Sequence, residues 1–507
     1  MKNLNEILYK NSEFADKIIF SETTSYTYSE LISISESLCF YLCSQGLQPG
    51  EPVGILGFNS PEFVAASFGI WRANGTVIPL NYSFKPEELF KIIKKTELKF
   101  IFIDDVFLQN EAFRNVIAAS GLKVISMRGN SYQAGINFNE ISAAVDKEIS
   151  ALDYNENNPA LLIFTSGTTS EPKGVVLTHK NMIANIISMS NVLIFKDDDL
   201  ILNILPLFHV FSFNCATLLE LYSRARVFML ERFSPKQTLE TIFSRKITIL
   251  LAVPAMLKLL IICKTKENTD TSSLRLAISG GAALDSCTFD AFKKEFGIYT
   301  HEGFGLTETS PVCTLNLLDR PPLKNSIGLP LKNVKLRIIN ESGDECKTGE
   351  RGELLVYGDN VMPGYFRDLV STKEAFTSDG WYKTGDIAEC DAQGYYYIVD
   401  RLKDMIIVNG LNVYPADIEN IILTHGAIIE TSVIGAEDKK HGEKIVAFVV
   451  PKNIETFDKN RVLTYVKSKL AHYKVPDRLI IVEQLPKSAI GKVLKKELKV
   501  LYKKMEE

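Results

Sequence analysis

The sequence predicts an α/β protein: a large composite N-terminal domain with mainly parallel sheets flanked by helices, followed by a small α+β C-terminal lid domain. Short apolar runs rich in Val, Ile and Phe alternate with segments of helical periodicity, which is typical of βαβ units and a mainly parallel sheet. The 507 residues exceed the ~250–300 that one compact core can hold. Near residue 400 the pattern of apolar and charged residues and the balance of charge both change, which indicates where the second domain begins.

The N-terminal part contains the clearest helices and strands. A helix is expected near Pro86 to Lys95, and the apolar run KFIFID that follows it predicts a strand; LKVISM, PALLIFT and LILNILPL predict further strands. The most hydrophobic stretch, Ile247 to Cys263, is interrupted by Pro254 and Lys258 and is too short to span a membrane. We interpret it as a buried strand, ITILLAV, a turn at Pro254 and a helix from Ala255.

The chain changes character after Tyr395. The segment YYYIVDRLKDMIIVNG predicts a strand, a charged turn and another strand, and a helix is expected to open near Pro415. From Lys403 to Glu507 there are 18 Lys and Arg against 14 Asp and Glu, whereas the rest of the chain has 39 against 47. A boundary near residue 400 therefore separates an acidic body from a basic C-terminal part, although solvated faces of different composition would give the same counts.

Composition excludes several classes of protein. With 46% hydrophobic and 23% charged residues, the chain is neither disordered nor a collagen or coiled coil. A net charge of −4 does not indicate a surface that binds polyanions such as nucleic acid. Eight cysteines without a CxxC pair indicate reduced, buried thiols and a cytoplasmic location, and the first residues, MKNLNEILYKNSEF, lack a signal-peptide core. No transmembrane segment is expected, while peripheral membrane contact and the oligomeric state stay open.

The most informative motif is the loop within LLIFTSGTTSEPKGVVLTH, residues 161–179. After a buried strand, Lys173 is preceded by small and hydroxyl residues, namely Thr165, Ser166, Gly167, Thr168, Thr169 and Ser170. Small residues let backbone N–H groups approach phosphate oxygens, hydroxyls donate further hydrogen bonds, and Lys173 supplies a cation. It is not a Walker A loop, because no Gly directly precedes Lys173 and no Ser or Thr follows it. Taken alone, a phosphate cradle and an ordinary loop are about equally supported.

TSGTTSEPKG resembles the phosphate-loop signature of the adenylate-forming (AMP-binding) superfamily, which includes acyl-CoA synthetases, aryl-CoA ligases, luciferases and amino-acid adenylation domains. Further segments resemble that family's motifs in the expected order: LPLFHVFSF, SGGAAL, EGFGLTE, GWYKTGD, DRLKDMIIVNGLNVYPADIE and PKSAIGKVLKKEL. This ordered series covers most of the chain and is very specific. One departure is Ser170, where the family usually has Gly, so we expect a stiffer loop with an altered grip on pyrophosphate.

The resemblance implies an N-terminal adenylation domain over residues 1–399 for ATP and the acyl substrate, a hinge over 400–405 and a mobile C-terminal domain over 406–507. Rotation about Lys403 would alternate two half-reactions, and Gly410 and Leu411 would line a CoA channel. Catalytic roles are implied for four residues: Lys492, His209, Thr165 and Glu308. The implied ATP- or AMP-binding residues are Thr165, Ser166, Gly167, Thr168, Thr169, Lys173, Gly281, Ala282, Glu302, Gly303, Phe304, Gly305, Thr307, Asp386, Arg401 and Lys492.

The chemistry of these residue types agrees with such roles. A carboxylate that attacks the α-phosphate of ATP needs cations and Mg²⁺ more than a base. Glu308 suits Mg²⁺, which favours one or two carboxylates plus phosphate oxygens, and Asp386 suits the two ribose hydroxyls, although each could be an ordinary turn residue. The planar guanidinium of Arg401 suits ribose or phosphate, and the flexible ammonium of Lys492 can bridge carboxylate and α-phosphate. His209 lies in an apolar run, where a core histidine is the alternative.

The nature of the acid is less defined. No Asp occurs at Phe208 to Val210, where related amino-acid adenylation domains bind an ammonium, so an acid without an α-amino group is favoured. The segment FHVF resembles medium- and long-chain fatty acyl-CoA synthetases most, and no extra insertion follows Glu308 before Gly380, which favours CoA as acceptor. We expect ATP-dependent activation of such a fatty acid and transfer to CoA, with Mg²⁺ as cofactor. An aryl-CoA ligase, or an enzyme loading a carrier-protein phosphopantetheine, is the alternative.

Overall fold

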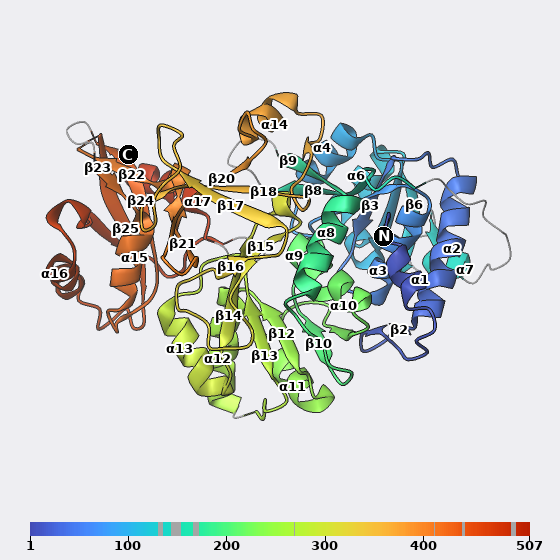
Figure 1. Ribbon diagram of the computed structural model, residues 1–507, viewed down its shortest axis with the longest axis horizontal. Coiled ribbons are helices and arrows are strands. Elements are labelled where there is room, and N and C mark those ends of the chain that lie inside the picture. Colours follow the sequence, from blue (N-terminus) through green and yellow to red (C-terminus); the bar gives the residue numbers. More distant parts are fainter. Residues whose placement is uncertain are drawn as a thin grey trace.

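Two large, mainly parallel sheets dominate the N-terminal part of the chain, as the alternating sequence pattern predicts. The computed structural model describes residues 1–129, 135–142, 154–165, 172–267, 269–409, 411–438, 442–487 and 493–506. Figure 1 shows the first sheet on one side of the molecule, the second below it, and the C-terminal elements as a separate body on the opposite side. The predicted α/β class is confirmed.

The first large sheet has eight strands in the order β19-β9-β8-β4-β3-β5-β6-β7. Its strands are β3 (Pro52–Leu56), β4 (Thr76–Pro79), β5 (Phe100–Asp104), β6 (Lys123–Arg128), β7 (Ile136–Asn137), β8 (Pro159–Thr165), β9 (Lys173–Thr178) and β19 (Gly364–Tyr365). The helices from this part of the chain are α1 (Glu6–Lys10), α2 (Tyr28–Ser44), α3 (Pro61–Arg72), α4 (Pro86–Thr96), α5 (Asp105–Leu108), α6 (Glu111–Ala119), α7 (Phe138–Ser142) and α8 (His179–Ser190). The sheet is parallel except at β9, which runs antiparallel to β8 and β19.

The second large sheet has nine strands in the order β16-β15-β14-β13-β12-β10-β11-β1-β2. They are β1 (Ile19–Phe20), β2 (Ser25–Tyr26), β10 (Leu200–Asn203), β11 (Arg226–Met229), β12 (Ile249–Ala252), β13 (Leu276–Ser279), β14 (Thr300–Gly305), β15 (Val312–Leu315) and β16 (Leu329–Pro330). Its helices are α9 (Val210–Phe213), α10 (Leu219–Tyr222), α11 (Pro235–Arg245), α12 (Pro254–Glu267) and α13 (Ser286–Phe296), with a π-helix over Asn214–Leu218. Helix α12 begins at Pro254 itself, because proline needs no N–H partner in a first turn.

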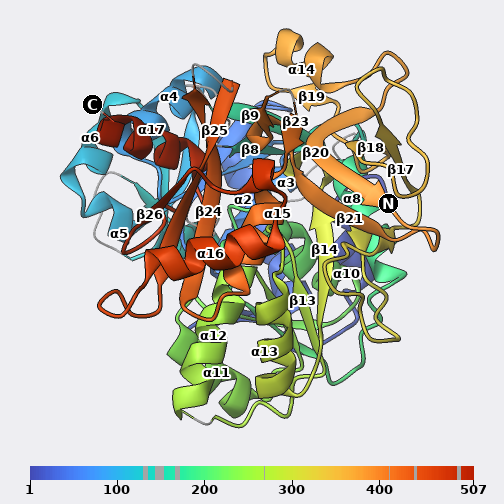
Figure 2. The same ribbon diagram turned by 90° about the vertical axis from the view of Figure 1, so that its left-hand side faces the viewer.

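The remaining strands form two smaller sheets. An antiparallel sheet, which the parallel pattern did not anticipate, contains β17 (Val334–Ile339), β18 (Gly352–Gly358), β20 (Tyr382–Cys390) and β21 (Tyr396–Arg401), with α14 (Leu369–Ala375) nearby. The C-terminal body contains β22 (Ile406–Val408), β23 (Leu411–Val413), β24 (Ile428–Asp438), β25 (Gly442–Pro451), β26 (Arg478–Ile481), α15 (Pro415–Leu423), α16 (Lys459–Lys469) and α17 (Lys495–Glu506). It has its own apolar core and faces the viewer in Figure 2.

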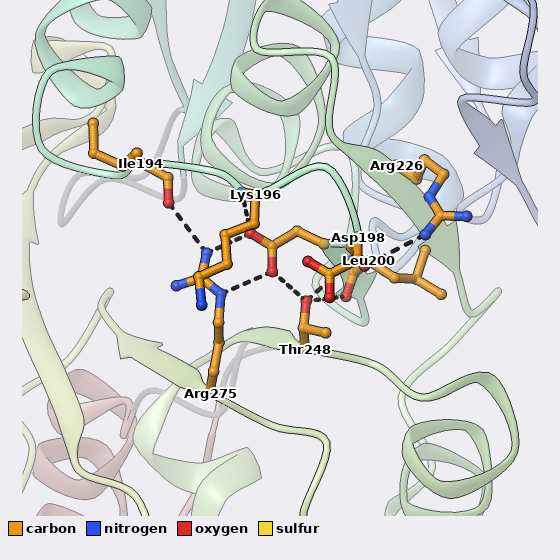
Figure 3. A network of polar contacts seen from close by, with 8 residues as sticks. Ile194, Lys196, Asp198, Leu200, Arg226, Thr248 and Arg275 are labelled. Carbon is orange, nitrogen blue, oxygen red and sulfur yellow. Dashed lines mark hydrogen bonds and ion pairs between the residues drawn. The ribbon is translucent and has the colours of Figure 1, made fainter.

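A buried ion pair fastens the amino ends of three neighbouring parallel strands in the second large sheet. Asp199, directly before β10, pairs with Arg275, directly before β13, and accepts a hydrogen bond of 2.7 Å from Thr248 Oγ1, directly before β12 (Figure 3). Arg275 holds the pKa of Asp199 low, against the effect of burial, which raises it. Because ligands of such sheets bind at the carboxyl ends of the strands, this network is structural, and the opposite edge is where a site is expected.

All eight cysteines are free thiols. Cys39, Cys215 and Cys313 are buried as predicted, whereas Cys43 and Cys287 are exposed, so the expectation of uniformly buried thiols was wrong. Cys43 lies in the last turn of α2 and Cys287 in the first turn of α13, where helix ends reach the surface. Within the described ranges, the helices are all too short or too polar to cross a membrane.

Candidate active site

Predicted site residues gather at the carboxyl edge of the second large sheet. His209 follows β10, Gly281 and Ala282 follow β13, and Glu308 follows β14 after a short connection. Strands β10, β12, β13 and β14 are consecutive parallel neighbours, so their carboxyl ends meet at one edge. This edge is the place where open α/β sheets bind ligands.

Tyr365 connects Glu308 to Lys173. Its hydroxyl donates a hydrogen bond of 3.1 Å to Glu308 Oε1, and the Lys173 ammonium lies 5.1 Å from the centre of its ring. Burial, together with the neighbouring Glu308 carboxylate, raises the pKa of Tyr365, so the phenol remains a donor. The tyrosine arrives from β19, which pairs with β9, the strand that begins at Lys173. Sequence reasoning missed Tyr365, because no local motif marks a side chain that acts across two strands.

The surroundings of Glu308 fit a magnesium ion taken together with a nucleotide. The carboxylate is half-buried on a tight 3₁₀ turn over Thr307–Thr309. In the described part of the chain, no group of three or more His, Cys, Asp or Glu side chains could hold a metal by itself. A single carboxylate suits Mg²⁺, because this ion keeps waters and takes most of its other oxygens from substrate phosphates.

Glu302 holds the loop after β13, which contains the predicted nucleotide-binding residues Gly281 and Ala282, to the sheet. The Leu284 amide donates a hydrogen bond of 2.9 Å to Glu302 Oε1, so β14 fixes the segment that contains Gly281. Burial raises the pKa of Glu302 to about 8. The carboxyl group is therefore largely protonated at neutral pH. In this structure it accepts a hydrogen bond from the loop.

Two glycines of β14 let this strand approach the neighbouring β15 closely. A Cβ at Gly303 would come within 3.0 Å of the Thr314 carbonyl oxygen, and one at Gly305 within 1.9 Å of the Pro311 carbonyl oxygen. Gly305 in particular is required for the close approach of the two antiparallel strands. Phe304, between them, is partly buried and packs towards the antiparallel sheet.

Asp386 and Arg401 form a cross-strand pair in the antiparallel sheet. They face each other in the register of β20 and β21, and Arg401 Nε lies 2.8 Å from Asp386 Oδ1. The Asp386 side chain is 3% exposed, whereas that of Arg401 is 34% exposed. Thr384 Oγ1 accepts a hydrogen bond of 3.0 Å from the Asp386 amide. The two residues that sequence motifs assigned to the ribose therefore lie together.

His209 caps helix α9. Its Nδ1 accepts a hydrogen bond of 3.3 Å from the Phe211 amide, so in the neutral ring the proton is on Nε2. His209 is half-buried, and its sequence neighbours Phe208 and Phe211 are aromatic. Phe208 packs edge-on against Tyr82, with the two ring centres 5.0 Å apart. The Phe211 ring lies close to Gly280: a Cβ added to this glycine would be 3.3 Å from the ring. The segment that carries His209 is thus lined with apolar rings.

The predicted hinge residue Lys403 lies in a 3₁₀ turn, Leu402–Asp404, between β21 and β22. Burial and the positive charge of Arg401 lower the pKa of Lys403. Asp400, which sequence reasoning did not single out, accepts a hydrogen bond of 2.7 Å at Oδ2 from the Ala416 amide in the first turn of α15. This contact ties the last strand of the antiparallel sheet to the C-terminal body.

Several predicted residues lie outside the described residues or at their margin. Those outside are Ser166, Gly167, Thr168, Thr169, Ser170, Gly410 and Lys492. Thr165 is the last residue of β8, and Leu411 begins β23 with 49% of its side chain exposed. Their roles stay predictions.

Comparison with known proteins gives a consistent result. Residues 9–366 match the family model described as AMP-binding enzyme, and residues 417–492 match that of the AMP-binding enzyme C-terminal domain. Indoleacetate–CoA ligase of Aromatoleum aromaticum is 32% identical over 480 residues, which cover 94% of this chain and 93% of that protein. Long-chain-fatty-acid–CoA ligase of Yersinia pestis is 31% identical over 505 residues, with coverage of 93% and 89%.

Solved structures of similar proteins cover nearly the whole chain. ATP-bound MatB from Rhodopseudomonas palustris has a TM-score of 0.91 and 29% identity, with 100% of both chains covered. The o-succinylbenzoate CoA synthetase MenE from Bacillus subtilis, in complex with ATP and a magnesium ion, has a TM-score of 0.84 and 27% identity, with 98% of this chain and 99% of that chain covered.

Proposed function

The chain belongs to the AMP-binding enzyme family, and from this premise we propose that it joins a medium- or long-chain fatty acid to CoA through an acyl-adenylate. Acid–thiol ligase activity is supported by the indoleacetate–CoA ligase and the long-chain-fatty-acid–CoA ligase, which join an acid to CoA. The observation that carries the proposal is the gathering of Glu308, His209 and the loop after β13 at one sheet edge, with Lys173 joined to Glu308 through Tyr365. ATP and CoA are the co-substrates.

We assign the residues as follows. Asp386 and Arg401 bind the ribose, Lys173 and its loop bind the phosphates, and His209 lies beside the reacting carboxylate. Glu308 would hold Mg²⁺, which neutralises phosphate charge when bound. Lys492 bridges the carboxylate and the α-phosphate, so Lys492→Ala should abolish adenylate formation but spare thioester formation from supplied acyl-AMP. Equal loss in both half-reactions would contradict that assignment.

The aromatic lining near His209 supports an apolar acid. Each CH₂ that enters an apolar pocket contributes about 0.8 kcal/mol, so activity should rise along a series of straight-chain acids until the pocket is full. An aryl acid is the second candidate, because relatives include indoleacetate–CoA ligase and 4-coumarate–CoA ligase. Phe208, Tyr82 and Phe211 could pack against a ring as well as against a chain.

A pyrophosphate-release screen separates these candidates. Purified protein is tested with ATP, Mg²⁺ and a panel of straight-chain acids, benzoates, phenylacetates, cinnamates, malonates and amino acids. Activity that grows with chain length supports the fatty acid, whereas a flat response with high activity on an aromatic acid supports an aryl-CoA ligase. Preference for malonate or an amino acid over every apolar acid would refute both. Adding CoA or a phosphopantetheinyl carrier protein then identifies the acceptor.

The proposed location is cytoplasmic. Support comes from the eight free cysteines, because exposed thiols such as Cys43 and Cys287 persist in a reducing compartment.

A further inference from the structure

The turn that carries Glu308 is held by its backbone carbonyls. Each carbonyl oxygen from residue 308 to residue 312 accepts a hydrogen bond, and the donors in chain order are Met362 N (2.8 Å), Asn360 Nδ2 (2.9 Å), Asn214 Nδ2 (2.6 Å), Leu306 N (3.1 Å) and Asn185 Nδ2 (2.7 Å). Ser310 has a φ of 69°, a left-handed conformation that is unfavourable for a residue with a side chain. The conformation of the turn therefore depends on these donors.

Asn214 is the donor that comes from the acid side of the site. It opens the π-helix that continues α9, whose N-cap is His209, and this π-helix packs against α8. Its Nδ2 donates to the Ser310 carbonyl and also to Asn185 Oδ1 at 3.3 Å. Asn185 in turn donates to the Val312 carbonyl, so it braces both Asn214 and the strand after the turn. Helical irregularities of this kind are frequent at functional sites.

Stability alone does not explain an amide at this position. The Asn214 side chain is 1% exposed, and its Oδ1 accepts no hydrogen bond within the residues that the structure describes. A buried amide with an unsatisfied oxygen costs free energy that an apolar side chain of similar size would not. The value of Asn214 therefore lies in its donor group, which is aimed at the turn of Glu308.

We propose that Asn214 is a positioning residue that couples the acid-binding segment of His209 to the magnesium-binding turn of Glu308. The inference rests on the proposed function. When the acid contacts α9, it shifts the π-helix that continues α9. The hydrogen bond from the Asn214 amide transmits this shift to the Ser310 carbonyl, two residues beyond Glu308. Such coupling is reciprocal: the acid strengthens binding of Mg²⁺-ATP by the same factor by which Mg²⁺-ATP strengthens binding of the acid.

The test measures binding, so that it does not depend on turnover. The dissociation constant of a non-hydrolysable ATP analogue is determined calorimetrically with Mg²⁺ and with a chelator, in the absence and presence of an accepted acid. Asn214→Leu should lose about tenfold of the Mg²⁺-dependent affinity and most of the acid-dependent gain, because its side chain has similar size but no donor. Affinity for the chelated nucleotide should change less than about twofold.

Asn11→Leu is the matched control. Asn11 is also fully buried, and its Nδ2 donates at 2.9 Å to the Leu221 carbonyl, outside the candidate site. Asn11→Leu should lower the unfolding midpoint at least as much as Asn214→Leu, because both amide atoms of Asn11 are hydrogen-bonded, but it should keep the Mg²⁺ and acid effects of the wild type. If the two variants change nucleotide binding equally, Asn214 is merely structural and the inference is wrong.

A double-mutant cycle with Glu308→Gln completes the test. If Asn214 acts through Glu308, the effect of Asn214→Leu on Mg²⁺-dependent affinity should vanish in the Glu308→Gln background. If Glu308→Gln weakens Mg²⁺-dependent binding and the two losses add, the coupling is refuted while the role of Glu308 stands. If Glu308→Gln leaves Mg²⁺-dependent binding intact, the magnesium assignment and the coupling both fail.

Discussion

Asp386, paired with Arg401, is the proposed acceptor for the ribose hydroxyls of ATP. Replacing one of its carboxylate oxygens measures how much that oxygen contributes to ATP affinity. Asp386→Asn keeps the shape but replaces a charged acceptor of two hydroxyls with one amide oxygen. Hydrogen bonds to charged groups contribute about 1.5–3 kcal/mol, so the dissociation constant for ATP should rise roughly 10- to 150-fold while that of the acid changes little. Calorimetric titration with each ligand checks this.

Asp379→Asn is a suitable control for Asp386→Asn. Asp379 pairs with Arg337 at 3.0 Å, so it also places a carboxylate against an arginine of the antiparallel sheet, but its side chain is 55% exposed and, in the described structure, does not contact Arg401. Its substitution should leave ATP affinity unchanged. Unchanged ATP affinity in Asp386→Asn would contradict the ribose assignment.

Glu302 gives the protein a pH-dependent stability. Its pKa in the folded state, about 8, lies above the ordinary value of 4.5, so folded protein binds a proton that unfolded protein releases between these values. This contribution is complete below pH 4.5 and is lost as pH rises through about 8, with a slope of at most about 1.4 kcal/mol per pH unit. Glu302→Gln stays neutral and keeps an acceptor for the Leu284 amide, so its stability relative to the wild type should increase from pH 5 to pH 8.

Thermal or denaturant unfolding at several pH values tests this. Glu455→Gln, at an exposed position, should run parallel to the wild type at every pH. A constant difference between Glu302→Gln and the wild type would mean that Glu302 titrates normally in the folded protein.

At the scale of residues, sequence motifs identified individual candidate side chains but not the side chains that contact them. Lys173, His209, Glu308 and Asp386 each belong to a local pattern of residue types. Tyr365 and the two asparagines of the magnesium turn do not, because the hydrogen bonds of Asn185 and Asn214 join residues 127 and 96 positions apart. Such pairs are created only when strands and helices from distant parts of the chain pack together.

Helix α8 shows how one side chain can start a helix and also fix a neighbouring segment. Asn181 accepts from the Thr178 amide and hydroxyl at 2.9 and 2.8 Å, and its Nδ2 donates to the carbonyls of Asp359 and Val361 at 2.7 and 2.9 Å. Asn181→Ala would keep the bond from the residue 181 amide to Thr178 Oγ1, but it would remove the side-chain half of the capping box and the two hydrogen bonds to residues 359 and 361. We expect a loss of about 2–3 kcal/mol in the free energy of unfolding, measured by chemical denaturation.

The capping box of α2 provides the comparison. Thr27 accepts from the Glu30 amide at 3.1 Å on an exposed helix end, and within the described residues its side chain makes no hydrogen bond to another element. Thr27→Ala should therefore cost only about 1 kcal/mol. Equal losses for Thr27→Ala and Asn181→Ala would show that the contact of Asn181 with residues 359–361 adds nothing.

At the scale of elements, the apolar runs of buried parallel strands were predictable, whereas of the half-exposed antiparallel sheet only β21, within YYYIVDRLKDMIIVNG, was predicted. FIFID in β5 is buried throughout and stands out as a continuous apolar run. VKLRII in β17 mixes charged with apolar residues and faces solvent on one side, so it gives a weaker signal. The antiparallel sheet that carries Asp386 therefore had to be seen in three dimensions.

The C-terminal body is held against the N-terminal part by a few polar contacts besides the chain connection. Arg351 lies 3.5 Å from Asp417, which also pairs with Lys474 at 2.8 Å, and Asn412 donates to Glu341 at 3.4 Å. These contacts are half-exposed and individually weak. The shift of charge near residue 400 indicated a second domain, but no local sequence pattern could indicate which charges meet across the junction.

Sparse contacts of this kind suit a C-terminal body that rotates about Lys403 between two half-reactions. The 3₁₀ turn at Leu402–Asp404 has backbone angles compatible with proline, which fixes φ near −65° and removes an N–H. Lys403→Pro should therefore hold one orientation: the variant should exchange pyrophosphate with ATP in the presence of acid but lose most thioester formation, as measured by separate assays of the two steps. Lys403→Ala, which removes the side chain but leaves the backbone free, should retain both steps. If Lys403→Pro slows both steps equally while circular dichroism shows folded protein, rotation at this residue is not the switch; if it slows neither, the pivot lies elsewhere in residues 400–405.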